Sequence, residues 1–319
     1  MRSLVLGLLI LLGTSLSAFT LGSFLGRFHW TLDLFSHFHL QYAALLGLCF
    51  VATLLLRERL LAALLLPALL ANITLLAPFF LPSSGPAEAS MTRTTDAPPR
   101  TLSVMALNVY MDNDNYAAIS DYLREENADV EMLSENKPAL MRALKETVVD
   151  LYPHIYDESA RGTYGLALLS RHPFEEARSV SLGGRGRRIL EVTLAEPAPV
   201  TFFGVHPLPP LGSRWAARRN DELAAVGRLV QGTTNPVVLL GDFNASPWSR
   251  PIKQLTRTTA LRFANLGFGI RPTWSYRSPL LSAPIDHIFV SPAWQVSSYH
   301  VGRAVGSDHL PVVAELVLP

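Results

Sequence analysis

Residues Val237 to Ser246 read VVLLGDFNAS, an apolar run that ends abruptly at Gly241, Asp242 and Asn244. Consecutive apolar residues are typical of a strand buried inside a sheet, whereas Gly, Asp and Asn favour a turn. Turn chemistry alone can explain this ending at a single strand. If polar residues end several strands at one edge of the sheets, the pattern instead indicates a functional site.

The composition of the chain is uneven along its length. Of 319 residues, 49% are hydrophobic and 17% charged, which is too apolar for a purely soluble enzyme. Residues 1–82 carry only four basic and two acidic residues, which leaves 23 basic and 24 acidic for the remainder, a net charge of −1. That remainder has no overall basic excess of the kind that nucleic-acid-binding domains show. The single cysteine, Cys49, excludes a disulfide within the chain.

Three apolar runs near the start are long enough to cross a bilayer core of roughly 30 Å. They span residues 4–26, 40–56 and 60–81. A cleaved signal peptide is the alternative for the first run, and a buried soluble bundle is the alternative for all three. The presence of two further runs favours a retained anchor, and the lack of charged helix faces argues against a soluble bundle. We therefore predict three transmembrane helices in residues 1–82.

The few charges near these runs predict an orientation. Arg2 and the sequence RER at 57–59 would lie on the cytoplasmic side, because basic residues favour that side. Three spans then put the rest of the chain outside the cytoplasm, in the periplasm if the source is a diderm bacterium. The connector FHWTLDLFSHFHLQY, residues 28–42, is expected at the membrane interface, with Trp30 at headgroup depth. A histidine metal site there is the less favoured alternative.

The remainder divides into a linker and a catalytic domain. Residues 83–100 are rich in Pro, Ser, Thr and Ala and predict a flexible tether. Residues 101–319 alternate short apolar runs with helical patterns, and several strands are consecutive, so the sheets must be mixed. We expect strands at 101–109, 130–133, 165–170, 188–194, 200–206, 236–240, 285–291, 295–302 and 310–318, and helices at 116–127, 214–231 and near 250–256.

Polar residues stand at the ends of these predicted strands. They are Asn108, Glu135, His206, the pair Asp242 and Asn244, Asp286, and the triplet Ser307, Asp308 and His309. Each of them alone reads as a turn or cap residue. Six strand ends with carboxylates, amides and imidazoles are hard to ascribe to turns. If they share one edge, they form a site.

In its order of motifs, residues 101–319 resemble the endonuclease/exonuclease/phosphatase superfamily, which includes DNase I, apurinic endonucleases, neutral sphingomyelinases and inositol-polyphosphate phosphatases. The matching segments are LNVY, DVEMLSENK, GLALLSRHPF, VHPLP, LLGDFNASP, IDHIFVS and GSDHLPVVAEL. The resemblance implies a four-layered α/β sandwich of two mixed β-sheets flanked by helices. The anchor resembles that of bacterial members with several N-terminal spans.

Phosphoester hydrolysis needs a neutralised phosphate and an activated water. Mg²⁺, or Mn²⁺ in its place, suits oxygen ligands. Glu135 is the first candidate ligand, with Asp308 assisting and Asn108 supplying an amide. No Ser or Cys nucleophile motif is evident, which favours direct attack by water.

The resemblance also implies roles for the remaining polar residues. Asp242 would orient or deprotonate the water, and a crowded acidic rim would give it the raised pKa of a base. Asn244 would hold a phosphate oxygen. His309, paired with Asp286, would face the phosphate as an imidazolium, and His206 would be the second histidine; which of the two acts as the acid stays open.

Two features depart from the family pattern. Ser134 precedes Glu135 where the family often has Gln, so a supporting amide is missing. Tyr110 stands where some nucleases have Asp, so a second metal carboxylate is in doubt there.

Substrate contacts are expected from one of two arginine clusters and from an aromatic residue. Arg185, Arg187 and Arg188 lie in a glycine-loosened loop that could grip an anionic headgroup or a phosphate backbone, and Trp274 is a further candidate. Arg214, Arg218 and Arg219 are expected on a solvated helix face.

The sequence thus predicts a membrane-anchored, metal-dependent phosphoester hydrolase with no obligate protein partner. Its substrate is a nucleic acid, a phospholipid or a small phosphoester. A lipid-headgroup phosphodiesterase is the close rival to a nuclease, and a catalytically inactive binding module is the alternative from another class.

Overall fold

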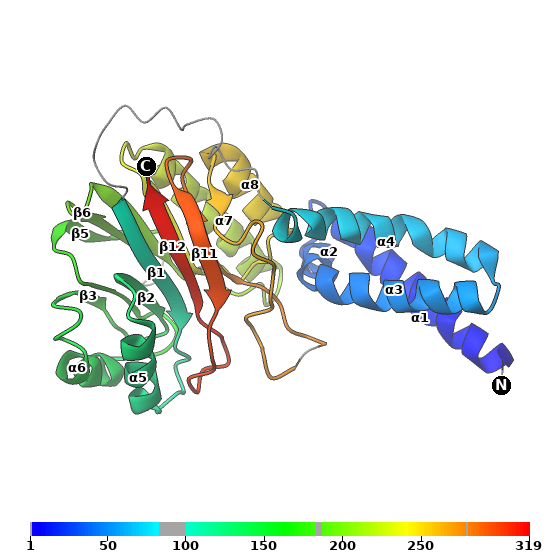
Figure 1. Cartoon of the computed structure of the whole chain (residues 1–319), viewed down its shortest axis with the longest axis horizontal. Coiled ribbons are helices and arrows are strands. Elements are labelled where there is room, and N and C mark those ends of the chain that lie inside the picture. Colours follow the sequence, from blue (N-terminus) through cyan, green and yellow to red (C-terminus); the bar gives the residue numbers. More distant parts are fainter. Residues whose placement is uncertain (1, 83–99, 183–186, 279) are drawn as a thin grey trace.

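The computed structural model of the chain describes residues 2–82, 100–182, 187–278 and 280–319. Two six-stranded sheets form the C-terminal part (Figure 1). In spatial order, the first contains β11 (Gln295–Val301), β12 (Val312–Leu318), β1 (Arg100–Asn108), β2 (Val130–Ser134), β4 (Leu166–Ser170) and β3 (His154–Glu158). The second contains β5 (Phe174–Ser181), β6 (Arg188–Leu194), β7 (Val200–Val205), β8 (Val237–Asp242), β10 (Asp286–Val290) and β9 (Arg262–Phe263).

Both sheets are mixed. The pairs β1–β2 and β7–β8 are parallel, and the other described pairs are antiparallel. Parallel neighbours end at the same edge of a sheet, so the polar residues that follow β1 and β2, and those that follow β7 and β8, meet at one edge of each sheet.

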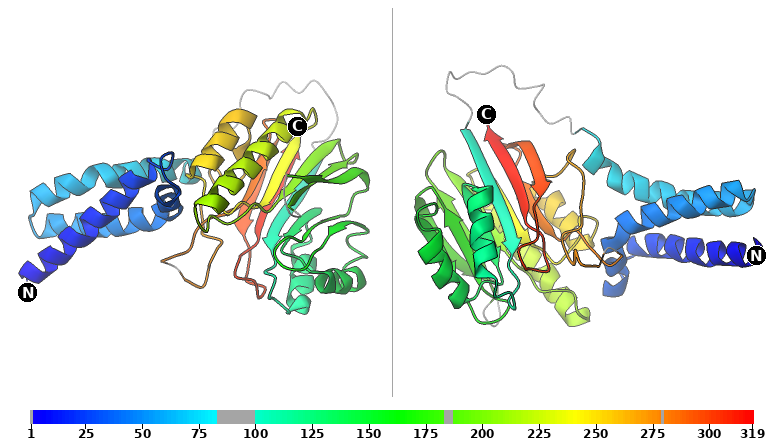
Figure 2. Two further views of the ribbon diagram at one scale, coloured as in Figure 1. Left: turned by 180° about the vertical axis from the view of Figure 1, so that it is seen from behind. Right: turned by 60° about the horizontal axis from the view of Figure 1, so that its bottom comes forward.

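The alternation of side chains along β1 explains the layers. Val104 and Ala106 belong to the core between the two sheets, whereas Met105 and Leu107 face the helices on the outer side. The outer helices are α5 (Tyr116–Glu126) and α6 (Pro138–Thr147) on the first sheet. The second sheet is covered by α7 (Ser213–Gln231) and α8 (Arg250–Thr259). Figure 2 shows these four layers, which confirm the predicted α/β sandwich.

The expected strands and helices of this sandwich are present, with ends shifted by at most three residues. Sequence patterns missed α6, β3, β5 and the two-residue β9. Residues of β3 and β5 are half-buried or exposed, because both strands lie at sheet edges, so they lack the apolar run that marks a buried strand.

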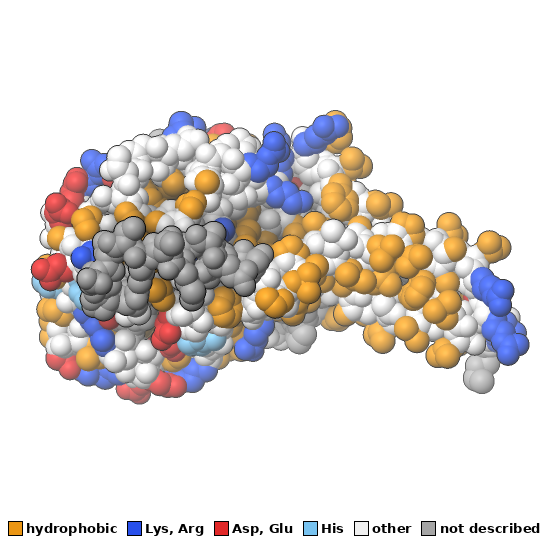
Figure 3. All heavy atoms as spheres, turned by 45° about the horizontal axis from the view of Figure 1, so that its top comes forward, with side chains coloured by type: hydrophobic (Ala, Val, Ile, Leu, Met, Phe, Trp, Pro, Cys, Tyr) orange, Lys and Arg blue, Asp and Glu red, His pale blue; other side chains and the backbone are white. Residues whose placement is uncertain are grey.

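The N-terminal part is a bundle of α1 (Arg2–Ser23), α3 (His39–Leu55) and α4 (Arg59–Phe80), with α2 (Trp30–Leu34) and a 3₁₀ helix, η1 (Phe35–Phe38), between the first two. Three helical segments, 2–23, 30–55 and 59–80, are long and apolar enough to cross a membrane. Figure 3 shows hydrophobic side chains over much of the visible bundle surface, with Lys and Arg gathered near its two ends.

The end of the bundle remote from the sandwich brings the predicted cytoplasmic residues together. Arg2 donates a hydrogen bond to the Leu56 carbonyl at 3.1 Å and pairs with Glu58 at 3.1 Å. The start of α1 and the turn between α3 and α4 therefore lie on one side. Of the predicted tether, residues 83–100, positions 83–99 lie outside the described residues. Arg100 is the first residue of β1.

The connector between α1 and α3 packs against the sandwich. Asp33 accepts hydrogen bonds from the backbone N–H of Arg250 at 2.8 Å and from Arg219 at 2.9 Å. Ser246 donates to the Ser36 carbonyl at 3.0 Å. The prediction that Arg219 lies on a solvated helix face is therefore wrong, because its side chain is 1% exposed in this contact.

The end of α4 makes a second contact with the sandwich. Backbone N–H groups of Gly267 and Gly269 donate to the carbonyls of Pro78 and Phe79 at 3.1 and 2.6 Å. The indole of Trp248 donates to the Leu75 carbonyl at 3.0 Å. The bundle and the sandwich thus share a buried interface on the segments that follow β8 and β9.

Candidate active site

The segment VVLLGDFNAS forms β8 and the turn that follows it, as predicted. Gly241 has φ +137°, and a Cβ at this position would lie 2.1 Å from the Val205 carbonyl oxygen. The close parallel pairing of β7 with β8 therefore requires glycine here. This strand packing is the structural reason for the glycine before Asp242.

Strand register places two carboxylates opposite each other. Asp242 ends β8 and Asp286 begins the antiparallel β10, where the two are direct partners. His309 lies between them: its Nδ1–H donates to Asp286 Oδ2 at 2.9 Å, and its Nε2 is 3.7 Å from Asp242 Oδ2. All three side chains are buried. The structure therefore brings together three of the predicted catalytic residues.

The charges in this group determine its protonation. Burial alone would lower the pKa of the His309 imidazole, but the carboxylates of Asp286 and Asp242 raise it to about 10. Burial would raise the pKa of Asp242, yet His309 and His206 lower it. The prediction of a raised pKa for Asp242 is wrong, because two imidazoles beside its carboxylate outweigh the effect of burial.

The second histidine approaches Asp242 from the other side. His206 follows β7, donates from Nδ1 to the Thr163 carbonyl at 3.0 Å, and points Nε2 at Asp242 Oδ2, 3.4 Å away, and at Glu135 Oε1, 3.7 Å away. Its orientation is fixed by the hydrogen bond on Nδ1.

Glu135 and Asn108 come from the ends of β2 and β1. Asn108 Nδ2 donates to Glu135 Oε1 and to Asp242 Oδ2, both at 3.1 Å. The backbone N–H of Met111 donates to Glu135 Oε2 at 3.0 Å. Asn108 thereby supports Glu135, whose preceding residue, Ser134, offers no amide side chain.

The predicted role of Asn108 as a metal ligand does not fit this arrangement. Its Oδ1 accepts the backbone N–H of Tyr110 at 3.0 Å, so its amide nitrogen, not its oxygen, faces the carboxylates. Asn108 is a hydrogen-bond donor to the site here.

Two site residues have left-handed backbones. Glu135 has φ +60° and Asn244 has φ +48°. Such conformations cost on the order of 1 kcal/mol for residues other than glycine and are common at functional sites. Asn244 donates from Nδ2 to the Pro207 carbonyl at 3.0 Å and lies 3.5 Å from Asp242 Oδ2.

Asp308 and Trp274 form a pair at the mouth of the site. The Trp274 indole donates to Asp308 Oδ2 at 2.9 Å, and its ring lies 6.3 Å from the His309 ring. Asp308 Oδ1 and Asp286 Oδ1 are buried and have no hydrogen-bond partner among the residues that the structure describes. Trp274 is 39% exposed, so part of its ring is open to solvent beside the site.

The arginine loop is only partly described. Arg185 lies outside the described residues. Arg187, predicted as a substrate contact, is buried, pairs with Glu222 at 3.3 Å and donates to the His206 carbonyl, so it supports the His206 segment. Arg188 is half exposed and contacts Ser179 and Glu158.

Two hydroxyl side chains support the site through backbone groups. Thr273 Oγ1 accepts the backbone N–H of Asp286 at 3.2 Å, and Ser307 Oγ donates to the Asn108 carbonyl at 2.7 Å. Ser307 belongs to the predicted strand-end triplet, whereas Thr273 was not recognised from the sequence, because it stands in no motif and its contact with Asp286 forms only in the folded chain.

Residues 105–309 match the sequence model of the Endonuclease/Exonuclease/phosphatase family. The chain belongs to the endonuclease/exonuclease/phosphatase family. Members of this family hydrolyse phosphoester bonds. None of the curated proteins matches the chain.

Solved structures of the endonuclease/exonuclease/phosphatase family share the sandwich. A family member from Beutenbergia cavernae is 23% identical, with a TM-score of 0.57 over 69% of this chain and 72% of the other. A family protein from Bacteroides thetaiotaomicron is 18% identical, with a TM-score of 0.58 over 70% and 100%. TDP2 from D. rerio, complexed with a single-strand DNA product, is 18% identical, with a TM-score of 0.57 over 68% and 98%.

Proposed function

We propose that the protein is a membrane-anchored phosphoester hydrolase that uses a divalent cation and direct attack by water. The observation that carries the proposal is the buried group Asp242, Asp286 and His309, whose ligand atoms lie within 4.8 Å of one another, at the edge where Glu135 and His206 converge. Burying several charged groups together costs folding free energy. Clusters of this kind are therefore typical of functional sites.

The donors at this edge suit a hard cation such as Mg²⁺ or Mn²⁺. Carboxylate oxygens are the preferred ligands of Mg²⁺, and Asp308 Oδ1 lacks a hydrogen-bond partner among the described residues. Glu135 and Asp308 would hold the ion. When bound, it would neutralise charge on the phosphate oxygens.

The side chains of this chain perform the remaining steps. Asp242 orients the attacking water, with its charge stabilised by Asn108 and the two histidines. The protonated His309, held by Asp286, stabilises negative charge that develops on the phosphate. The side-chain amide of Asn244 donates to the Pro207 carbonyl at 3.0 Å and to Asp242 Oδ2 at the longer distance of 3.5 Å, and the hydrogen of the longer bond would turn to a phosphate oxygen.

We further propose that the three apolar helices cross a bacterial inner membrane, with the catalytic domain on the periplasmic side. The contacts of Arg2 with Leu56 and Glu58 support this orientation, because they place Arg2 at the same end of the bundle as the sequence RER at 57–59.

A lipid-headgroup phosphodiesterase is favoured over a nuclease by one observation. The segment that follows Trp274 runs from the site to the bundle. There, Gln41 at the start of α3 donates to the Ser282 carbonyl at 2.6 Å. Leu280 and Leu281, beside this contact, are 71% and 63% exposed. Figures 1 and 2 show the segment before β10 extending from the sandwich toward the side of the bundle. This arrangement would present the mouth of the site to lipids.

The test is hydrolysis by the full chain, purified in detergent, with Mg²⁺ or Mn²⁺. DNA, RNA, phospholipids, sphingomyelin and simple phosphoesters are the substrates. Asp242→Ala and His309→Ala should abolish turnover, while His300→Ala, on an exposed histidine of β11, should not. Absence of turnover on every substrate, or turnover in both site variants equal to that of the parent protein, would contradict the proposal.

A further inference from the structure

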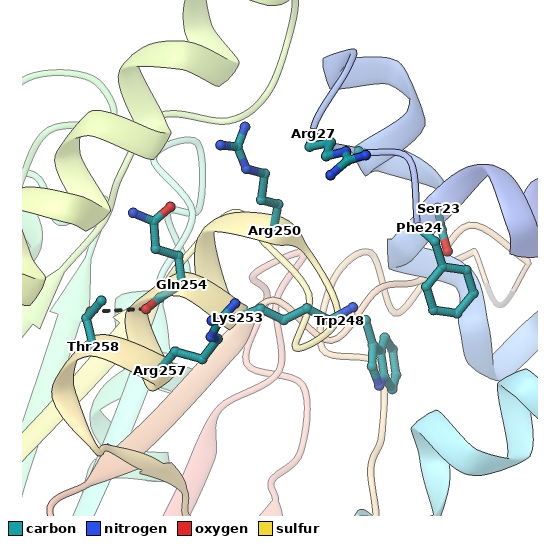
Figure 4. Close-up of a pocket in the computed structure, with 10 residues that line it drawn as sticks. Ser23, Phe24, Arg27, Trp248, Arg250, Lys253, Gln254, Arg257 and Thr258 are labelled. Carbon is teal, nitrogen blue, oxygen red and sulfur yellow. Dashed lines mark hydrogen bonds between the residues drawn. The ribbon is translucent and has the colours of Figure 1, made fainter.

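A cavity separate from the candidate active site lies at the junction of the bundle and the sandwich. It has a volume of about 550 Å³ and is lined by the end of α1, the residues that follow it, Trp248 and one face of α8. Figure 4 shows Arg250, Lys253 and Arg257 arising from α8, with Arg27, Ser23 and Phe24 across the cavity. None of the proposed catalytic or metal-binding residues lines it.

The lining is strongly cationic. Arg250, Lys253 and Arg257 recur at spacings of three and four residues, which puts them on one face of α8, and Arg27 faces them from the connector. Within the described parts of the chain, no acidic residue lines the cavity and none of these four cations takes part in an ion pair. We name Arg27, Arg250, Lys253 and Arg257 the junction cluster.

The nearest acid is already used elsewhere. Asp33 pairs with Arg219 at 2.9 Å and accepts the backbone N–H of Arg250 with its other oxygen. Asp33 therefore forms no ion pair with a side chain of the junction cluster, and the like charges gathered at this cavity repel one another. An anionic ligand would relieve that repulsion.

The cavity lies where the candidate spans end. Ser23 is the last residue of α1, and Trp248 bonds to Leu75 near the end of α4. The ammonium of Lys253 is 5.7 Å from the centre of the Phe24 ring, so a cation and an aromatic side chain lie together just beyond the end of α1. If α1 and α4 cross a membrane, the cavity opens at headgroup depth, where Trp, Lys and Arg are typical.

We propose that the junction cluster binds the phosphate of an anionic phospholipid headgroup. Arginine forks match phosphate oxygens, and a cavity of this size holds one headgroup. The acyl chains would then lie along the apolar surface of α1 and α4, which contains exposed leucines such as Leu21. The inference rests on the membrane anchoring proposed above, but not on catalysis.

The experiment measures lipid binding by the full chain carrying Asp242→Ala, so that hydrolysis does not interfere. The protein is placed in nanodiscs of phosphatidylcholine, with or without phosphatidylglycerol, and retained lipid is counted by native mass spectrometry. Thermal unfolding is recorded in parallel. Phosphatidylglycerol should be retained and should raise the unfolding temperature.

Two triple variants distinguish lipid binding in the cavity from a general effect of positive charge. Arg250→Ala, Lys253→Ala and Arg257→Ala together should weaken phosphatidylglycerol retention by about a hundredfold, since each cation near a membrane contributes about fivefold. The matched control replaces the exposed Arg214, Arg218 and Arg228 of α7 with Ala, which removes the same charge and should leave retention unchanged. The same triple variants without Asp242→Ala should keep activity on a soluble phosphoester, which shows that they fold.

Three results would overturn the inference: equal retention of phosphatidylcholine, unchanged retention in the α8 variant, or stabilisation by inorganic phosphate alone equal to that by the lipid. Short single-stranded DNA that displaces the lipid would indicate a nucleic-acid site instead. Metal-dependent hydrolysis without lipid retention would refute this inference alone, whereas lipid retention without hydrolysis would refute the proposed function alone.

Discussion

Arg219 of α7 and Asp33 of the connector, 186 positions apart, form a buried ion pair with a Nη2–Oδ2 distance of 2.9 Å. Their side chains are 1% and 6% exposed. Arg219 also donates from Nη1 to the Asn244 carbonyl at 3.0 Å. The pair therefore links the connector of the N-terminal bundle directly to the turn that carries Asp242 and Asn244.

Removal of one partner should destabilise the protein. Asp33→Ala leaves Arg219 buried and unpaired, which typically costs about 3–5 kcal/mol. We expect a lower unfolding temperature in detergent and slower hydrolysis. The double variant Asp33→Leu with Arg219→Met should be less damaged than Asp33→Ala, because no charge stays buried. A single variant as stable as the parent would contradict a structural role for the pair.

The Asp286–His309 pair should matter more for catalysis than for folding. Asp286→Asn removes the carboxylate that holds the imidazolium, and His309→Ala removes the imidazolium itself. We expect kcat to fall by about 10²–10⁴-fold in each, with the double variant no worse than His309→Ala, since the two act as a unit. Steady-state kinetics measure this, and independent, multiplying losses would argue against a coupled pair.

Metal removal should stop hydrolysis reversibly. Dialysis against EDTA is expected to abolish activity, and Mg²⁺ or Mn²⁺ should restore it in the parent protein. Glu135→Gln keeps the shape of the side chain but loses a charged ligand, so calorimetry should show weaker Mg²⁺ binding. The hypothesis of a metal-dependent site fails if EDTA-treated protein retains full activity.

Leu280 and Leu281 should decide access to membrane-borne substrate. Aspartate at both positions should reduce hydrolysis of vesicle phospholipid by about tenfold or more, because a charge disfavours insertion into lipid. Hydrolysis of a soluble phosphoester should not change. Val149→Asp, on another exposed apolar residue, serves as the control. Equal losses on both substrates would indicate damage to the site instead.

Glu131 should make stability depend on pH. Its side chain is fully buried, Tyr152 donates a hydrogen bond to it at 2.6 Å, and burial raises the pKa of its carboxyl well above the ordinary value. The folded state then holds a proton that the unfolded state releases, so stability falls as pH rises above about 4.3 toward the folded pKa. Glu131→Gln should remove this decline.

Thermal unfolding between acidic and neutral pH measures the effect. The advantage of Glu131→Gln over the parent should grow with pH. Glu146→Gln, on the exposed face of α6, should show no such growth. Parallel curves for the parent and Glu131→Gln would exclude an ionisation of Glu131 coupled to folding.

Much of the sandwich was predictable because its central strands are buried. VVLLGD, VTFFGV and VEMLS have every residue buried, so each appears as an apolar run with a polar end. Edge strands β3 and β5 face solvent and carry charges such as Glu176, so their pattern resembles a loop. The predicted strand-end residues Asp242, Asp286, His309, Glu135 and His206 meet because parallel strands end together and β8 pairs with β10 in register.

The functions of individual side chains in the site were less predictable. A motif gives the position of Asn108 but not that its oxygen is taken by Tyr110, which turns its nitrogen toward the carboxylates. The sequence predicted Arg187 as a substrate contact and Arg219 as an exposed residue of a helix. Their burial depends on Glu222 and Asp33, partners 35 and 186 residues away that local spacing does not reveal.

The sequence by itself determined most of the strands, the polar residues at their ends and the apolar N-terminal helices, because periodicity and turn chemistry are local. The four layers were predicted only through the resemblance to the family. Only the tertiary structure decided what those residues contact. The pKa of Asp242 is lowered because two histidines from remote segments lie beside it. Three cations of α8 face Arg27 of the connector, and none of these four forms an ion pair with a residue that the structure describes. Electrostatic environments arise from distances between segments remote in the chain, and these exist only once the chain has folded.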